Sequence, residues 1–199
     1  MEEQLQCLDL KTCPGGQRVA GQNGVTLLEL LVIVAIFGVL ASIAFLGLDG
    51  WHRSRLGAAT GALLADLQTA RMNAMTESSD PDGRGFGLRF LDNQSYKVFE
   101  FVDNGVTDFT YEGAAEEAGG YENRVGNGIS ITLGTAGNPA GVSNTLLYDK
   151  RGMGRTSNWS SVIPRTYVVR HSSLARARCI TVSQVRIREG IWNGSCTVK

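Results

Sequence analysis

The sequence is poor in the side chains that carry catalysis or bind metals. It has two histidines, His52 and His171, and four cysteines, and their spacings contain neither a C-x-x-C nor an H-E-x-x-H pattern. A glycine-rich phosphate loop and the serine turn of hydrolases are also missing. Each histidine is most simply explained as a surface or packing residue. We therefore expect a protein that is not an enzyme, with no catalytic residue, no cofactor and no metal site.

The chain also lacks net charge, but its charges are unevenly placed. Basic and acidic residues each number 19 in a chain of 199. Residues 80–149 carry four basic and eleven acidic residues, whereas residues 150–199 carry ten basic and one acidic. A region with this asymmetry is dipolar, and its basic half suits an anionic partner. The length is that of one ordinary domain plus an anchor.

One apolar run dominates the first quarter of the chain. The nineteen residues Leu30–Leu48 contain no charge, and with Val25–Leu28 they are long enough to cross about 30 Å of hydrocarbon as a helix. Glu29 is the single charge that interrupts them. One interpretation is a plain signal anchor. Another is a secretory signal that is cleaved after Ala44, where Ser42-x-Ala44 supplies the small residues of a cleavage site. However, the run exceeds the usual signal core of about 7–15 residues, and neither interpretation explains Glu29.

Glu29 is unfavourable in a membrane unless it has a partner. A carboxylate at the bilayer centre costs about 2.5–3.5 kcal/mol on the mildest scale, and less near a helix end, where it reaches the interface. One interpretation is therefore a glutamate of no consequence. Cleavage between Gly24 and Val25 would instead create an α-amino group four residues before it. In a bundle of such helices, one subunit's ammonium can neutralise a neighbour's carboxylate, which favours ordered assembly.

The segment GVTLLELLVIVAIFGVL resembles the signature of prepilins, the precursors of type IV pilin-like proteins. That signature is a glycine, an apolar residue, threonine, two apolar residues, glutamate and a long apolar run. The resemblance implies that prepilin peptidase cuts after Gly24 and N-methylates Val25. It also implies that Glu29 acts in assembly.

The same resemblance implies a topology and a set of partners. Residues 1–24 become a cytoplasmic leader, residues 25–50 a transmembrane and filament-core helix, and residues 51–199 a periplasmic head. The protein would cross the bacterial inner membrane once and then enter a filament. Trp51 and His52 would lie among the lipid headgroups, or else on an ordinary helix surface. The implied partners are other pilins or pseudopilins, prepilin peptidase and the inner-membrane assembly platform.

After the anchor, periodicity predicts more helix and then strands. If one helix runs from Val25 to about Glu77, it is roughly 80 Å long. Residues 103–128, rich in glycine and glutamate, are expected to form a long loop. One helical stripe with alternating spacings of four and three consists of Leu56, Thr60, Leu63, Leu67, Ala70 and Ala74. Alternation predicts a hairpin over 85–91 and 96–102, and strands at 129–133, 145–148, 165–170, 179–182 and 185–188.

Two segments of the head resemble the GspH/FimT group of pseudopilins and minor pilins. They are LLADLQTARMNAM, residues 63–75, and YDKRGMG, residues 148–154. The resemblance implies an α+β fold in which the long N-terminal helix packs on an antiparallel β-sheet head. It implies a structural subunit of a type IV pilus-like filament, with type II protein secretion favoured and a pilus left open as the alternative.

Cys179 and Cys196 are expected to form a disulfide. If the apolar run crosses a membrane, these two cysteines lie on its oxidising side, away from Cys7 and Cys13. Closing a loop of this length stabilises a fold by about 3 kcal/mol in the chain-entropy model. The alternative is a pair of buried free thiols.

The basic C-terminal quarter of the chain is the remaining feature that could indicate a binding function. In the segment VRIR, Arg186 and Arg188 are predicted to share one face of a strand and to contact successive phosphates. Arg176 and Arg178 add positive charge, and Trp192 is placed to stack on a base. Some members on the FimT side of the group bind DNA through such a region, so the resemblance implies DNA as an alternative partner. The simpler interpretation is pairing of these residues with the acidic region of the head.

Overall fold

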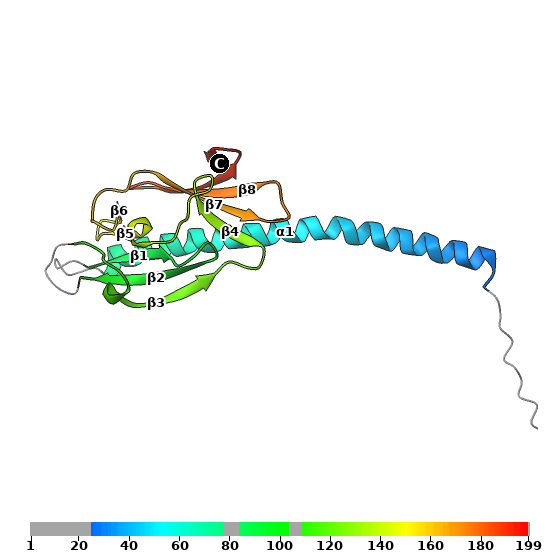
Figure 1. Cartoon of the computed structure of the whole chain (residues 1–199), viewed down its shortest axis with the longest axis horizontal. Coiled ribbons are helices and arrows are strands. Elements are labelled where there is room, and N and C mark those ends of the chain that lie inside the picture. The colour runs from blue at the N-terminus through cyan, green and yellow to red at the C-terminus, as the bar shows by residue number, and fades with distance from the viewer. Residues whose placement is uncertain (1–24, 78–83, 104–108, 199) are drawn as a thin grey trace, which may run out of the picture. The chain divides into compact units, whose positions relative to one another are not determined.

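A computed structural model describes residues 25–77, 84–103 and 109–198, with the backbone alone described for residues 43–48 and 84 (Figure 1). Cys7, Cys13 and Gly24 therefore lie outside the described residues. The chain divides into two units, Met1–Ile43 and Ala44–Lys199, and each is described by itself.

One helix, α1 (Leu27–Glu77), contains both the apolar run and the predicted stripe. Thr26 caps it, because the Glu29 N–H donates to Thr26 Oγ1 at 3.2 Å and the Leu30 N–H donates to the Thr26 carbonyl at 3.1 Å. A threonine followed three residues later by glutamate is the sequence pattern of a capping box, which specifies where a helix starts. The predicted helix, from Val25 to about Glu77, is confirmed to within two residues.

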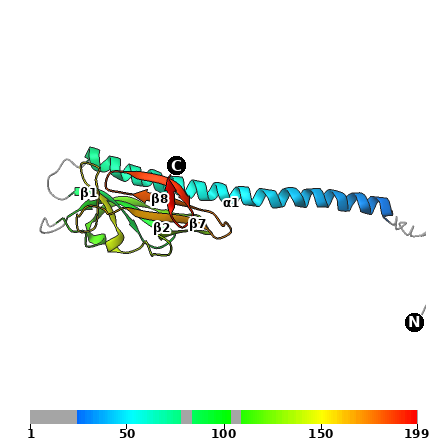
Figure 2. The same cartoon turned by 90° about the horizontal axis from the view of Figure 1, so that it is seen from above.

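The second unit contains two antiparallel sheets (Figures 1 and 2). In the described residues one sheet has the strand order β3-β2-β1-β5-β6, and the other has the order β10-β9-β8-β7-β4. The predicted hairpin is formed by β1 and β2, with Gly87 opposite Phe99. The bounds are β1 Arg84–Phe90, β2 Ser95–Val102, β3 Glu117–Arg124, β4 Ile129–Leu133, β5 Leu146–Tyr148, β6 Gly154–Arg155, β7 Arg165–His171, β8 Ala177–Val182, β9 Ile187–Trp192 and β10 Cys196–Val198.

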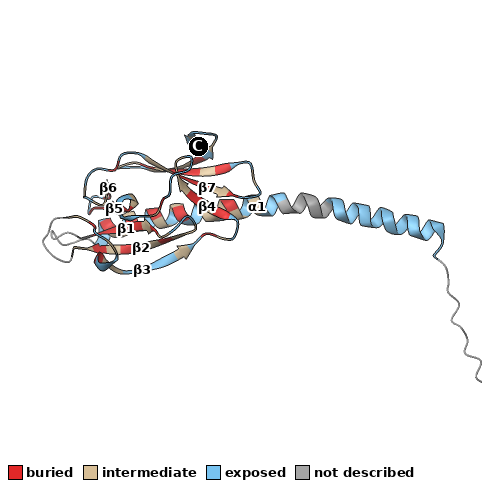
Figure 3. Cartoon of the chain, in the orientation of Figure 1, coloured by how far each residue is buried: buried red, intermediate tan, exposed pale blue. Residues whose placement is uncertain are grey.

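The C-terminal half of α1 is buried along the stripe that its spacing predicts. All six stripe residues are at most 4% exposed, and Figure 3 shows buried positions as bands along this part of the helix. The five apolar residues of the stripe form one core with Leu88 and Phe90 of the first sheet and Val169 and Ile180 of the second. The predicted α+β fold, with the helix packed on antiparallel β-structure, is confirmed. The head divides that structure between two sheets.

The predicted loop over residues 103–128 is wrong for much of its length. It contains a 3-10 turn, Ala114–Glu116, and the strand β3. β3 is an edge strand with the polar sequence EAGGYENR, so it lacks the alternation that marks a half-buried strand. Gly119 and Gly120 have φ values of 54° and 87°, and the pairing with β2 shifts register beside them. The glycines therefore form a β-bulge and do not end the strand.

Asp66 of α1 holds this edge strand on the helix. Its carboxylate accepts hydrogen bonds from the hydroxyls of Tyr96 and Tyr121, both at 2.7 Å, and from the side-chain amide of Asn123 at 3.2 Å. Desolvation and the hydrogen bond to Asp66 raise the pKa of Tyr121 to about 12, so its hydroxyl stays protonated at neutral pH. Polar contacts thus replace the apolar contacts that β3 is too polar to make.

A second carboxylate, Glu117, lies fully buried at the start of β3. It pairs with Arg89 Nε at 2.6 Å and with Lys97 Nζ at 2.9 Å, and the Tyr111 hydroxyl also donates to it. Desolvation by burial raises the pKa of Glu117, but the hydrogen bonds from Arg89, Tyr111 and Lys97 outweigh it and lower the pKa to about 2. The folded state therefore favours the ionised carboxylate.

We expect acid to weaken the head through Glu117. Because its pKa is lower in the folded chain than the ordinary value of 4.5, this stabilisation is complete above that pH and is lost as the pH falls towards 2. Glu117→Gln should lower the free energy of unfolding at neutral pH by about 2 kcal/mol and flatten its pH dependence. Urea unfolding at a series of pH values measures both effects. Glu122→Gln, at an exposed position of the same strand, is the matched control. An equal acid dependence in the Glu117→Gln variant and the wild type would contradict the assignment.

Candidate functional site

The described part of the first unit presents apolar side chains to solvent. Val25 is 60% exposed and Phe37 is 68% exposed, and Glu29 is exposed as well. Few soluble monomers expose apolar surface over several helical turns, so this surface is suited to partner helices or to lipid. The exposed large side chains are Val25, Leu27, Leu28, Leu30, Leu31, Val32, Ile33, Val34, Ile36, Phe37, Val39 and Leu40.

Within the ranges that the structure describes, no helix is both long enough and apolar enough to cross a membrane.

The start of α1 places Val25 and Glu29 about one helical turn apart. Val25 precedes the Thr26 cap, and Glu29 is the third residue after that cap. Four residues correspond to about 6 Å along a helix. An amine at Val25 and the carboxylate of Glu29 would give each copy one positive and one negative group near the end of its helix. A neighbour shifted along the axis could pair with both. Gly24, the predicted last leader residue, lies outside the described residues.

The two head segments that resemble the GspH/FimT group lie against each other. Gly152, with φ 69°, is in the turn between β5 and β6, and a Cβ there would meet Met75 Sδ at 2.7 Å and Arg71 Nε at 3.0 Å. Asp149 shapes the turn by accepting two of its backbone N–H groups and by pairing with Arg155 at 2.8 Å. Only glycine suits this conformation and this close contact. The two segments are therefore one packing unit between α1 and the first sheet.

The basic quarter of the chain is divided between the two ends of β8. Arg176 and Arg178 lie at the end that follows β7, whereas Arg186 and Arg188 lie at the end that leads into β9. Arg188 lies opposite Thr181, about 10 Å along β8 from Arg178, and the alternation of side chains puts Arg178 and Arg188 on opposite faces of the sheet. The four arginines therefore do not form one surface.

The predicted strand at residues 185–188 is wrong in its bounds, because β9 begins at Ile187. Arg186 lies in the preceding turn, where its N–H donates to Ser183 Oγ at 3.1 Å and its carbonyl accepts from the Ser183 N–H at 2.8 Å. Trp192 lies opposite Ala177, about 13 Å along β9 from Arg188. Arg186 and Arg188 are exposed as predicted, but Trp192 is at the other end of the strand.

Pairing between the basic quarter and the acidic region is limited. In the described ranges it consists of the ion pair of Arg155 with Asp149 at 2.8 Å. Arg178 pairs instead with Glu189 of the neighbouring strand at 2.6 Å, and its guanidinium lies over Gly57 of α1. Other arginines have no ion pair among the described residues. They include Arg53, Arg176, Arg186 and Arg188.

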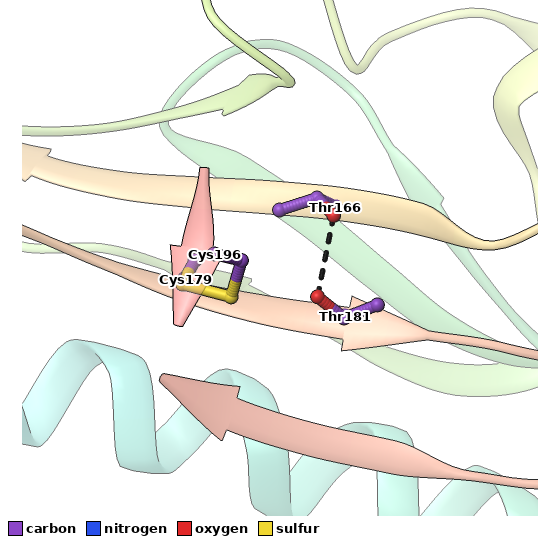
Figure 4. The surroundings of a disulfide bond; sticks show 4 residues. All are labelled: Thr166, Cys179, Thr181 and Cys196. Atoms are coloured by element: carbon purple, nitrogen blue, oxygen red, sulfur yellow. Dashed lines mark hydrogen bonds between the residues drawn. A yellow bond between two sulfur atoms is a disulfide. The ribbon is translucent and has the colours of Figure 1, made fainter. Parts of the chain in front are cut away.

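The predicted disulfide between Cys179 and Cys196 is present (Figure 4). Cys179 lies in β8 and Cys196 in β10, with β9 between the two strands. The bridge passes over Gly190 of β9, where an added Cβ would meet Cys196 Sγ at 3.1 Å and the Thr197 carbonyl oxygen at 2.4 Å. The missing side chain makes room for the bridge, which fastens the short edge strand β10 to the sheet.

The family model of the prokaryotic N-terminal methylation motif matches residues 20–45. This match supports a type IV pilin-family protein. It also supports a filament subunit that is processed by prepilin peptidase and assembles with other pilins, a structural role and not a catalytic one. No curated protein and no solved structure matches the chain. The matched residues include Gly24, Val25 and Glu29, whose predicted roles therefore lie inside the motif.

Proposed function

We propose that this chain is a minor pseudopilin, a structural subunit of the filament that drives type II protein secretion. The observation that carries the proposal is the methylation motif, followed by a helical segment with exposed apolar side chains. Residues 1–24 are the cytoplasmic leader, and residues 25–50 anchor the chain in the bacterial inner membrane by a single pass. The head, residues 51–199, lies in the periplasm until the assembly platform draws the subunit into the filament.

Assembly depends on charge pairing between neighbouring helices. Cleavage after Gly24 frees the Val25 amine, and methylation leaves it a cation. In the filament core this cation meets the Glu29 carboxylate of a neighbour, because burying either charge alone would be strongly unfavourable. The exposed apolar side chains of residues 27–40 then pack among neighbouring helices, and this packing removes them from contact with water or lipid.

The preference for secretion over a pilus rests on the head. Its two segments that resemble the GspH/FimT group form one packing unit around Gly152, Arg71 and Met75. The test is deletion of the gene in its host, with secreted proteins and pilus functions measured in the same strain. Secreted proteins held back in the periplasm, with twitching and DNA uptake intact, are the expected result. Loss of DNA uptake with normal secretion would favour a pilus.

The second candidate function is DNA binding by a minor pilin during uptake. Arg186 and Arg188 favour it, because both are exposed and neither has an ion pair among the residues that the structure describes. If they contact phosphates, Arg186→Gln combined with Arg188→Gln should weaken DNA binding by the full chain in detergent and reduce the salt slope by about 2. Gel-shift titrations over a range of salt concentrations measure this slope. Unchanged binding would exclude this surface as the DNA site. Arg165→Gln, a further arginine of the basic quarter, serves as the control.

A further inference from the structure

A groove of about 390 Å³ lies between α1, the start of β8 and the middle of β9, within the second unit. Its α1 wall begins at Asp49, the residue that directly follows the apolar run. The opposite wall is the turn between β7 and β8 together with the middle of β9. The α1 wall of the groove therefore starts at the end of the proposed anchor, residues 25–50.

Basic side chains predominate around this groove. Arg53, Arg176 and Arg178 line it, and its carboxylates are Asp49 and Glu189. Glu189 is engaged by Arg178 at 2.6 Å, whereas Arg53 and Arg176 are exposed and have no ion pair in the described part of the chain. These two arginines are therefore available to an anionic ligand.

One further arginine extends the basic surface beyond the groove. Arg170 lines an adjoining hollow that shares the β7–β8 turn with the groove. Together the groove and this hollow are lined by four arginines and two carboxylates. Arg55 lines a different hollow beside β3 and β4, and its guanidinium carbon is 5.0 Å from the centre of the Trp51 ring.

The groove also has an apolar wall. Leu56, Leu174 and Ile191 line it together with two alanines, Ala175 in the β7–β8 turn and Ala177 at the start of β8. Trp51 lies between Asp49 and Arg53 in α1 but on the other side of the helix from the groove, and it is 57% exposed. His52 does not share this exposure, because its ring lies 4.4 Å from that of His171. Of the two residues expected among the lipid headgroups, Trp51 is therefore the more exposed.

We propose that this groove binds the headgroup of an anionic phospholipid, with Arg53 and Arg176 on the phosphate. Apolar side chains beside arginines suit a ligand that has an acyl portion and a charged portion together. An exposed tryptophan at the end of an apolar helix is typical of the membrane interface. The site rests on the proposed anchoring of residues 25–50, since it then lies at headgroup level. It would hold the head at a fixed height until the subunit leaves the membrane.

The test uses the full mature chain in detergent, titrated with phosphatidylglycerol or phosphatidylcholine and followed by native mass spectrometry. The wild type should retain phosphatidylglycerol in clear preference. Arg53→Gln combined with Arg176→Gln should weaken that binding about thirty-fold, because each arginine near an anionic lipid contributes about a factor of five. The matched control is Arg186→Gln with Arg188→Gln, which removes the same charge at the other end of β8 and should leave binding unchanged.

Three results would overturn the site. They are equal retention of the two lipids by the wild type, equal losses in the two double variants, and binding of glycerol phosphate as tight as that of the lipid. The last result would identify a soluble phosphate as the ligand. The intact mass of the same sample reads the N-terminus, so a chain that does not start at methylated Val25 reveals failure of the proposed function separately. Each variant is also checked for folding of the head, which requires that the disulfide has formed and that the melting temperature equals that of the wild type.

Discussion

The Glu29→Ala variant is expected to be cleaved and methylated like the wild type, yet to enter filaments at least about tenfold less well. Removing Glu29 leaves a neighbour's Val25 ammonium buried without a counter-charge. Breaking a buried ion pair costs about 3–5 kcal/mol, and about 1.4 kcal/mol already changes an equilibrium tenfold. The measurement is the ratio of the subunit in sheared filaments to the subunit in membranes, by quantitative immunoblot.

Two further variants show whether the loss comes from this charge. Glu29→Gln keeps the size of the side chain and should assemble as poorly as Glu29→Ala. Glu77→Ala makes the same chemical change at the exposed last residue of α1 and should assemble normally. Wild-type incorporation of Glu29→Ala would contradict the pairing with Val25. If the same variant is not cleaved, Glu29 is required for processing by the peptidase, and the loss of assembly follows from that.

The Cys196→Ser variant is expected to lose about 3 kcal/mol of unfolding free energy. The bridge closes a loop whose ends are 17 residues apart in sequence, and a loop of that size restricts the unfolded chain by about this amount. Cys196 lies in an edge strand and is partly exposed, so the serine hydroxyl is solvated and adds little cost of its own. Urea unfolding of the full chain in detergent measures the change.

Reduction of the wild type supplies an independent estimate of the same quantity. A reductant should lower the stability of the wild-type chain by a similar amount and leave that of Cys196→Ser unchanged. Gly190→Val should prevent the bridge from closing, because its side chain would occupy the space of Cys196 Sγ and the Thr197 carbonyl. Equal stability of the oxidised and reduced wild-type chain would show that the disulfide does not hold β10 in place.

The parts of the fold that follow from apolar periodicity could be predicted from the sequence. The stripe that begins at Leu56 is buried as its spacing requires, and the hairpin of β1 and β2 follows the alternation of its residues. The disulfide could also be predicted, since Cys179 and Cys196 are the two cysteines on one side of the apolar run. The helix stripe and the hairpin are predicted by residues close together in the sequence, whereas the disulfide is predicted by the position of its cysteines relative to the apolar run.

The remainder depends on contacts between distant residues. β3 is a strand because it pairs with β2, and it is held on the helix by Asp66, more than fifty residues earlier, which accepts hydrogen bonds from Tyr121 and Asn123. Its own composition indicates only a loop. The ion pairs of Glu117 are likewise hidden, because nothing in the local sequence shows that a glutamate beside glycines is buried.

At the candidate site, sequence reasoning found the residues of the motif but not their full arrangement. The spacing of Thr26 and Glu29 is a capping-box signal that could have been used, and the structure shows Thr26 as the cap. The basic quarter looks like one surface in the sequence, but its arginines lie towards the two ends of β8 and on different faces of the sheet. Gly190 could have been noticed as a glycine inside a strand, which often marks a close approach. The sequence does not show that the disulfide between Cys179 and Cys196 passes over Gly190.

The central claim is that this chain is processed as a prepilin and that Val25 becomes its N-terminus. Mass spectrometry of the chain extracted from membranes of the native host tests it most directly. We expect a mature protein that begins at Val25 and carries one N-methyl group. An intact chain starting at Met1, or a chain starting after Ala44, would contradict the claim.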